Sequence, residues 1–79
     1  MDYFKLVTQT QVITGPHMLG KTAARRELAA IVKAEKDRIR KTGRKPFVFW
    51  SPDRLDCTIT LGPDKAHSPL WDRLVMVKT

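Results

Sequence analysis

The sequence has little of what stabilises small secreted domains and nothing that spans a membrane. Cys57 is the single cysteine, so an intrachain disulfide and a metal site built from several thiolates are both excluded. A lone cysteine fits a reducing compartment, and no segment approaches the roughly 20 apolar residues that cross a bilayer. The N-terminal residues also lack the basic stretch and apolar run of a secretory signal. We therefore expect a soluble, cytoplasmic protein with no membrane partner.

Groups that carry catalysis or bind metals are sparse as well. His17 and His67 are the only histidines, and both fall in predicted loops, where an ordinary surface role is expected. The aspartates of the C-terminal third are scattered, and most lie in or beside turns, where Asp is common. Cys57 alternates with apolar neighbours, which predicts an inert core thiol. We expect no catalytic activity, no bound metal and no cofactor.

Size and composition predict one folded unit. A chain of 79 residues buries too little surface for two cores, so residues 1–79 are predicted to form a single domain. The hydrophobic content of 42% lies in the range of globular proteins, so the chain is expected to fold without disulfides or metals.

Residues 22–42 are predicted to form one amphipathic helix, because they are rich in strong helix formers. Thr22 is a candidate N-cap, Gly43 occupies the position of a left-handed residue after the helix, and Pro46 prevents the helix from resuming. The apolar stripe at helical spacing consists of Ala24, Leu28, Ile31, Val32 and Ile39.

Four segments are predicted to form strands, in the order β-α-β-β-β. Residues 3–14 are rich in β-branched and aromatic types, and residues 47–50 form a short apolar run after Pro46. Residues 55–61 alternate between apolar and polar types, and residues 70–78 supply the last strand. Together they predict an α+β fold, in which one amphipathic helix packs on a small, mostly antiparallel four-stranded sheet.

The positive charge is concentrated in one third of the chain. Residues 21–45 contain ten Lys and Arg against three Asp and Glu, which accounts for the whole net charge of +7. At about 100° per residue, five of these cations fall on one arc of the helix roughly 100° wide, and others follow in the next loop. A one-sided patch of this kind is what binding to a phosphate backbone requires. The residues of this predicted binding patch, called the cationic surface below, are Arg25, Arg26, Lys33, Lys36, Arg40, Lys41, Arg44 and Lys45.

Residues 15–22 match the phosphate-binding pattern G-x-x-x-x-G-K-[ST] and resemble the Walker A loop of nucleotide hydrolases. Those enzymes also need a parallel sheet and a second strand that ends in a magnesium-binding aspartate, and this chain is too short for both. We therefore expect an ordinary connection between a strand and the helix, without ATP or GTP hydrolysis. The alternative is a helix start at which Gly20, Lys21 and Thr22 contact a nucleic-acid phosphate.

Glu35 is the exceptional residue of the helix, because it falls at the centre of the apolar stripe. A charge in that position must be paired or lie near an edge. We expect a basic side chain to neutralise it, the candidates being Arg38, Lys21 and Arg73. The alternative is an acid that binds a partner.

Two functions fit these observations. The first is a small, non-catalytic basic module that contacts phosphates of DNA or RNA through the cationic surface. Trp50 and Trp71 are the aromatics least securely assigned to the core and are candidates for stacking on bases. The second is a small inhibitor of the kind that phages and mobile elements encode, which binds and blocks a host nucleic-acid-handling complex. The chain is similar to anti-CRISPR proteins in size, compactness and lack of catalytic groups, and shares no motif with them.

Overall fold

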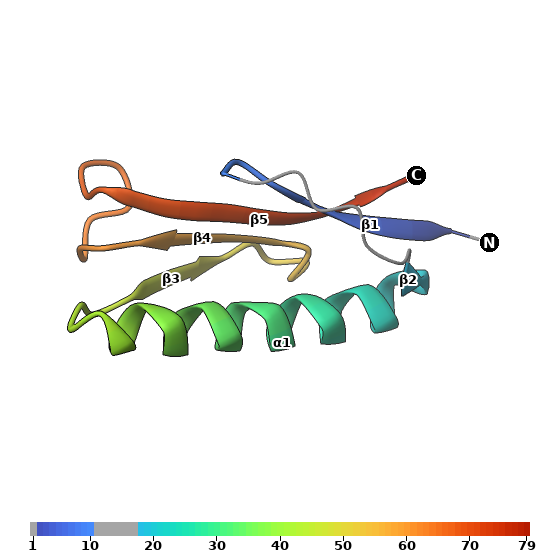
Figure 1. The fold of residues 1–79 in the computed structure, drawn as a ribbon. Helices are drawn as coiled ribbons and strands as arrows, with labels where there is room; N and C mark the ends of the chain where they lie inside the picture. The colour runs from blue at the N-terminus through green and yellow to red at the C-terminus, as the bar shows by residue number, and fades with distance from the viewer. Residues whose placement is uncertain (1, 11–17) are drawn as a thin grey trace.

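The computed structural model describes residues 2–10 and 18–79, which form an antiparallel sheet with one helix across a single face (Figure 1). The elements follow one another as β1 (Tyr3–Thr8), β2 (Met18–Leu19), α1 (Gly20–Lys41), β3 (Phe47–Trp50), β4 (Asp56–Thr60) and β5 (Leu70–Lys78). The strands lie in the order β2-β1-β5-β4-β3, and every neighbouring pair is antiparallel. The predicted α+β fold is confirmed, and the two-residue β2 adds to the predicted order of elements.

α1 begins earlier than its sequence suggests. The helix starts at Gly20, so Thr22 lies within the first turn, and its prediction as the N-cap is wrong. Gly20 has a φ of 82°, and its N–H donates a hydrogen bond to the carbonyl of Asp2 (2.8 Å), so the chain turns directly from β2 into the helix. Gly43 also has a φ of 82° and follows the last turn, as predicted.

The core lies between α1 and the sheet. The predicted apolar stripe faces it, and Leu28 and Ile39 are fully enclosed. Cys57 and Ile59 of β4 pack on the same side and are also fully enclosed, which confirms the prediction of a core thiol. The alternation predicted for this strand therefore holds, and the intervening Thr58 points to the opposite face.

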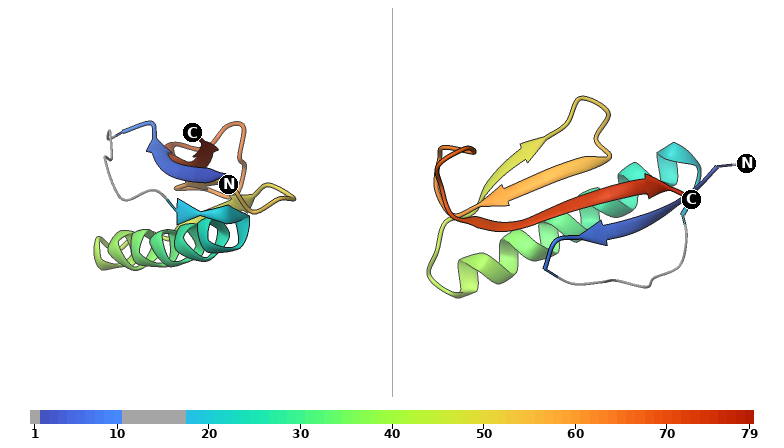
Figure 2. Two further views of the ribbon diagram at one scale, coloured as in Figure 1. Left: turned by 90° about the vertical axis from the view of Figure 1, so that its right-hand side faces the viewer. Right: turned by 90° about the horizontal axis from the view of Figure 1, so that it is seen from above.

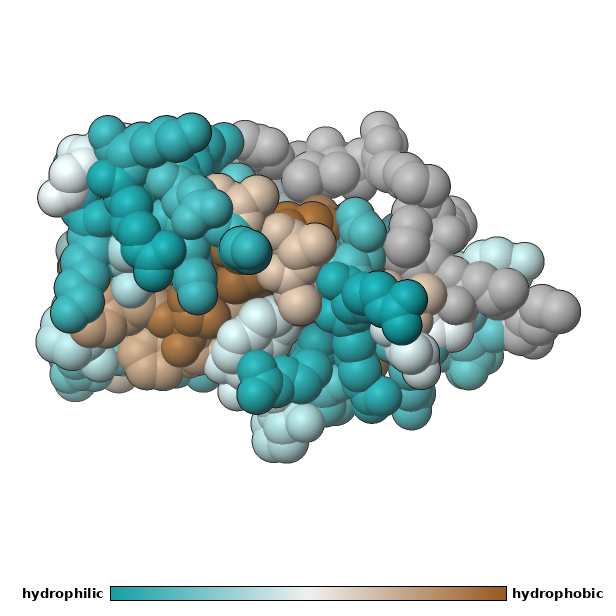
Figure 3. All heavy atoms as spheres, turned by 90° about the horizontal axis from the view of Figure 1, so that it is seen from below, coloured by the Kyte–Doolittle hydropathy of each residue, from teal (hydrophilic) through white to brown (hydrophobic). Residues whose placement is uncertain are grey.

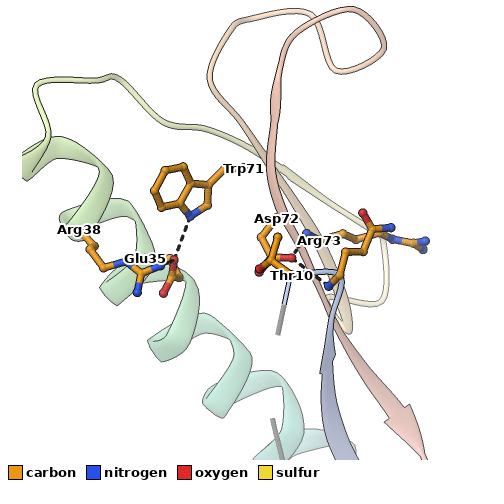
Figure 4. Close-up of polar contacts among 7 residues, drawn as sticks. Thr10, Glu35, Arg38, Trp71, Asp72 and Arg73 are labelled. Atoms are coloured by element: carbon orange, nitrogen blue, oxygen red, sulfur yellow. Dashed lines mark hydrogen bonds and ion pairs between the residues drawn. The ribbon is translucent and has the colours of Figure 1, made fainter. Parts of the chain in front are cut away.

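β1 is shorter than the strand predicted over residues 3–14, of which residues 11–14 lie outside the described residues. The carboxylate of Asp72 accepts hydrogen bonds from the N–H of Gln9 (3.0 Å) and the hydroxyl of Thr10 (2.7 Å), as Figure 4 shows for Thr10. These bonds turn the chain out of the ladder with β5. Asp72 is only 6% exposed, so this carboxylate has a structural role that its scattered position in the sequence does not reveal.

A β-bulge interrupts the pairing of β4 with β5. Ile59 pairs with Asp72 and Thr60 pairs with Leu70, so Trp71 is an extra residue. Neighbouring side chains of a strand ordinarily point to opposite faces, and a bulge removes that alternation locally. Because of the bulge, Trp71 and its neighbour Asp72 both lie on the helix side of the sheet, where Trp71 packs against the core.

The face of the sheet opposite α1 carries no further layer within the described residues, and the view from above shows it open (Figure 2). Tyr3 and Val7 of β1 are exposed, at 44% and 41%. Phe49 and Arg73 belong to the same open face, because they lie opposite one another across Thr58 in the register of β3, β4 and β5. In the parts of the chain described here, no helix is long and apolar enough to span a membrane.

Candidate nucleic-acid interface

The cations predicted on the helix follow one flank of α1, and two of them lie toward β4 and the turn between β3 and β4. Arg25 is placed there by a hydrogen bond from its Nε to the carbonyl of Asp53 (2.8 Å), in the turn between β3 and β4. The positive charge of Lys36 acts to lower the pKa of Cys57, so Lys36 lies on the side of α1 near β4. Cys57 pairs with Trp50 of β3. The remaining helix cations of the cationic surface are exposed, and on the face seen from the helix side hydrophilic side chains gather in separate groups with apolar ones between them (Figure 3).

Most of these cations have no acidic partner. Arg40 lies 3.4 Å from Asp37, but both side chains are more than half exposed, and such pairs contribute little. Arg26, Lys33 and Lys36 form no ion pair with any residue of the described chain. The positive potential along this flank is therefore not neutralised from within the protein.

The connection from α1 to β3 extends the charge beyond the helix. The N–H of Thr42 bonds to the Ile39 carbonyl, and that of Gly43 bonds to the Arg40 carbonyl (both 3.0 Å), so the chain reverses tightly. Lys41, Arg44 and Lys45 all remain exposed. The ammonium of Lys45 lies 5.4 Å from the centre of the Phe47 ring, which places this cation against β3.

A second pairing of a cation with an aromatic ring lies in the turn after β3. The guanidinium of Arg54 lies 5.1 Å from the centre of the Trp50 ring, and Arg54 has a φ of 61°. Asp53 holds this turn by accepting hydrogen bonds from the Ser51 hydroxyl and the Leu55 N–H, and these bonds lower the pKa of its carboxyl group. Trp50 is half-buried and packs against the core, so its ring does not belong to the open face of the sheet.

Trp71 is engaged within the protein as well. Its Nε1–H donates to Oε2 of Glu35 (3.0 Å), and the same oxygen accepts a hydrogen bond from Arg38 (3.0 Å; Figure 4). The Arg38 guanidinium also lies 5.7 Å from the centre of the Trp71 ring. The predicted neutralisation of Glu35 by Arg38 is confirmed, and the contact with Trp71 was not foreseen because it depends on the bulge in β5.

No protein-family model, curated protein or solved structure matches this chain. Its function is therefore inferred from its own surface.

The segment that resembles a Walker A loop does not have the surroundings of one. Residues 15–17 lie outside the described residues, and Met18 and Leu19 are paired with β1 as β2. The described sheet is antiparallel throughout, whereas nucleotide hydrolases use a parallel one. The Gly20 N–H is already bonded to Asp2, so the predicted phosphate contact would depend on the exposed Lys21 and Thr22.

The predicted histidines form no metal site in the described structure. His17 lies outside the described residues. Nδ1 of His67 is 2.7 Å from Asp64, and this hydrogen bond lowers the pKa of the Asp64 carboxyl group. Residues 2–10 and 18–79 contain no group of three or more side chains of the types that bind metals.

One feature of the surface was missed by sequence reasoning. A hollow of about 330 Å³ lies on the open face of the sheet, on the side of β3 and β4. Its lining comes from three strands and two connections, so no local pattern in the sequence marks it. The lining residues are Phe49, Ser51, Asp56, Thr58, Lys65 and Arg73.

Proposed function

We propose that this protein is a small, non-catalytic module that binds nucleic-acid phosphates through the cationic surface. The observation behind this proposal is the set of exposed cations along one flank of α1 and in the α1–β3 connection, most of them without an acidic partner in the described chain. Lysine and arginine neutralise phosphates and release counterions, which provides affinity without reading the sequence.

The dimensions of the surface suit a phosphate backbone. From Arg26 to Arg40 the helix rises about 21 Å, at about 1.5 Å per residue. Successive phosphates of one duplex strand are about 3.4 Å apart along the axis, so the helix alone extends past roughly six of them. Lys41, Arg44 and Lys45 continue the surface.

The helix dipole is the competing explanation of basic residues near a helix C-terminus. It accounts for Arg38, Arg40 and Lys41, which lie in the last turn. It does not account for Arg26 and Lys33, because the dipole acts only within the terminal turn. Binding to a polyanion explains both groups.

The test is to replace four cations with glutamine and to measure binding to duplex DNA and to RNA at several salt concentrations. We expect loss of binding at physiological salt. At low salt, where binding persists, the logarithmic salt dependence on duplex DNA should flatten by roughly 3 to 4 units, because each phosphate contact contributes about 0.9. The fold should remain, since the replaced side chains are exposed. The four residues are Arg40, Lys41, Arg44 and Lys45.

A matched comparison separates position from total charge. The double change Lys41→Gln and Lys45→Gln removes the same charge as Lys5→Gln and Lys78→Gln, two exposed lysines of the strands. The first pair should weaken binding strongly and the second only slightly. Equal losses, or full binding by the fourfold variant, would contradict the proposal.

The outer edge of β3 favours the second candidate function, an inhibitor that binds a protein complex. Within the described residues, no strand pairs with that edge. The N–H of Ser51 donates to the carbonyl of Asp56 (2.9 Å), and hydrogen-bonded pairs alternate along an antiparallel ladder. The backbone groups of Val48 and Trp50 therefore point away from β4, where a strand of another protein could bind them.

A pull-down from the source cell, with and without nuclease, distinguishes the two candidates. Nucleic-acid binding predicts that co-purifying material disappears after nuclease treatment. An inhibitor predicts that one protein complex is retained after nuclease treatment.

A further inference from the structure

β3 leads from one end of the cationic surface to the hollow on the open face of the sheet. Phe49 lines the hollow, and Phe47 precedes it by two residues on the same strand, so both rings belong to the same face of β3. Lys45, the last residue of the cationic surface, lies against the Phe47 ring. A continuous path therefore leads from the α1–β3 connection across two aromatic rings into the hollow.

The hollow combines an aromatic wall with polar groups of both kinds. Arg73 donates two hydrogen bonds to the carboxylate of Asp56, one of them from Nε to Oδ1 at 3.1 Å. The pair presents a flat polar surface whose charges offset each other. The hydroxyl of Thr58 and the ammonium of Lys65 have no partner among the described residues.

The volume and lining match a small planar ligand. About 330 Å³ falls at the lower end of the range of ligand pockets. The lining is mainly polar, with Phe49 as its one apolar side chain, so a ligand with one flat apolar face and several polar edge groups fits it. A nucleobase has a face that stacks on Phe49 and an edge that takes hydrogen bonds from Thr58 and Arg73. Lys65, an exposed lysine that also lines the hollow, is suited to the phosphate that follows the base.

We propose that the nucleic acid bound by this protein is single-stranded, and that it crosses Phe47 and Phe49 with one base in the hollow. This inference rests on the proposed function, because the end of the cationic surface in the α1–β3 connection supplies the contacts to the neighbouring phosphates. A duplex is excluded from the hollow, since its bases are paired and stacked inside the helix. The protein therefore prefers an unpaired strand to a duplex of equal length.

The test compares Phe49→Leu with Tyr3→Leu, which removes an aromatic ring from the open side of β1, three strands away. Affinities for fluorescein-labelled oligo(dT), oligo(U) and a duplex of matched length are measured by fluorescence anisotropy. Phe49→Leu should weaken binding of a single strand about tenfold and leave duplex binding unchanged, because only stacking is lost. Tyr3→Leu should change neither affinity by more than about twofold. The single strand with the greater loss identifies DNA or RNA as the ligand.

A second comparison does not require the replacement of an aromatic residue. Lys65→Gln and Lys5→Gln each remove one exposed charge, and thermal unfolding verifies that both variants fold. Only Lys65→Gln should lower the salt dependence of single-strand binding, by about 0.7 units.

The outcomes for this inference and for the proposed function are distinct. Binding that depends on the cationic surface but is equally affected by Phe49→Leu and Tyr3→Leu would overturn the base site and leave the phosphate-binding function standing. Equal affinity of the wild-type protein for single strands and duplexes would also overturn the base site and leave the phosphate-binding function standing. Absence of binding to any nucleic acid would overturn both.

Discussion

Cys57 lies in the middle of β4, where its thiol is fully enclosed by the core. Burial raises the pKa of the thiol to about 12, because the charged form is not solvated there. The thiolate is the reactive form, so the folded protein should resist thiol reagents at pH 8 and react at once in denaturant. Rapid labelling of the native protein would contradict the enclosed position.

The same shift predicts a dependence of stability on pH. The unfolded chain releases the thiol proton near pH 8.5, whereas the folded protein retains it up to about pH 12. The contribution of the neutral thiol is therefore complete below about pH 8.5 and is lost as pH rises above it, by at most about 1.4 kcal/mol per pH unit. Urea unfolding of the wild type and of Cys57→Ala over pH 8 to 10 measures this contribution. The free energy of unfolding of the variant should fall less steeply with pH, because the variant has no thiol.

Glu35 joins α1 to β5 through Trp71, and its acceptor oxygen matters more than its charge. Glu35→Gln keeps an oxygen for the indole N–H and loses the exposed ion pair with Arg38, so we expect a loss below about 1 kcal/mol. Glu35→Ala leaves the half-buried N–H of Trp71 without an acceptor, which should cost about 1 to 3 kcal/mol. Urea unfolding of both variants is the measurement, and equal losses would show that the charge dominates.

The end of α1 sets where the α1–β3 connection places its cations, and Gly43 is the residue that permits the turn. A Cβ at this position would meet nothing within 4 Å, so any cost of substitution comes from the φ of 82° and not from crowding. Gly43→Ala should lose about 1 kcal/mol of stability, whereas Gly43→Asn should lose less, because Asn tolerates the left-handed conformation. Chemical unfolding of the two variants tests this order, and an equal loss would contradict it.

The whole molecule has a net charge of +7, and all of the excess lies in residues 21–45. Cations that repel one another across the cationic surface destabilise the folded state at low salt. The Debye length falls from about 30 Å at 0.01 M to about 8 Å at 0.15 M, so added salt should raise the melting temperature. The fourfold glutamine variant should melt higher at low salt and respond less to added salt. An identical salt response in both proteins, measured by calorimetry, would contradict this account.

The sequence by itself determined the α+β class, the amphipathic helix, the enclosed thiol and the location of the charge. These depend on local spacing, because a buried stripe on a helix and alternation on a strand are periodic patterns within one segment. Gly43 and Pro46 marked the end of the helix, because the backbone preferences of glycine and proline also act locally. Five residues of the cationic surface were located through helical spacing, and the other three through their place at the helix end and in the loop that follows. The role of all eight in binding stays a prediction.

The tertiary structure alone decided which distant residues meet. Trp71 reaches Glu35 across 36 positions because the bulge in β5 reverses its side, and no periodic pattern predicts a bulge. Asp72 is buried because the N–H of Gln9, 63 positions away, and its neighbours satisfy the carboxylate. The hollow exists because the register of three strands places Phe49 beside groups from β4 and β5. Register follows from packing of the whole sheet, so only the folded chain contains this information.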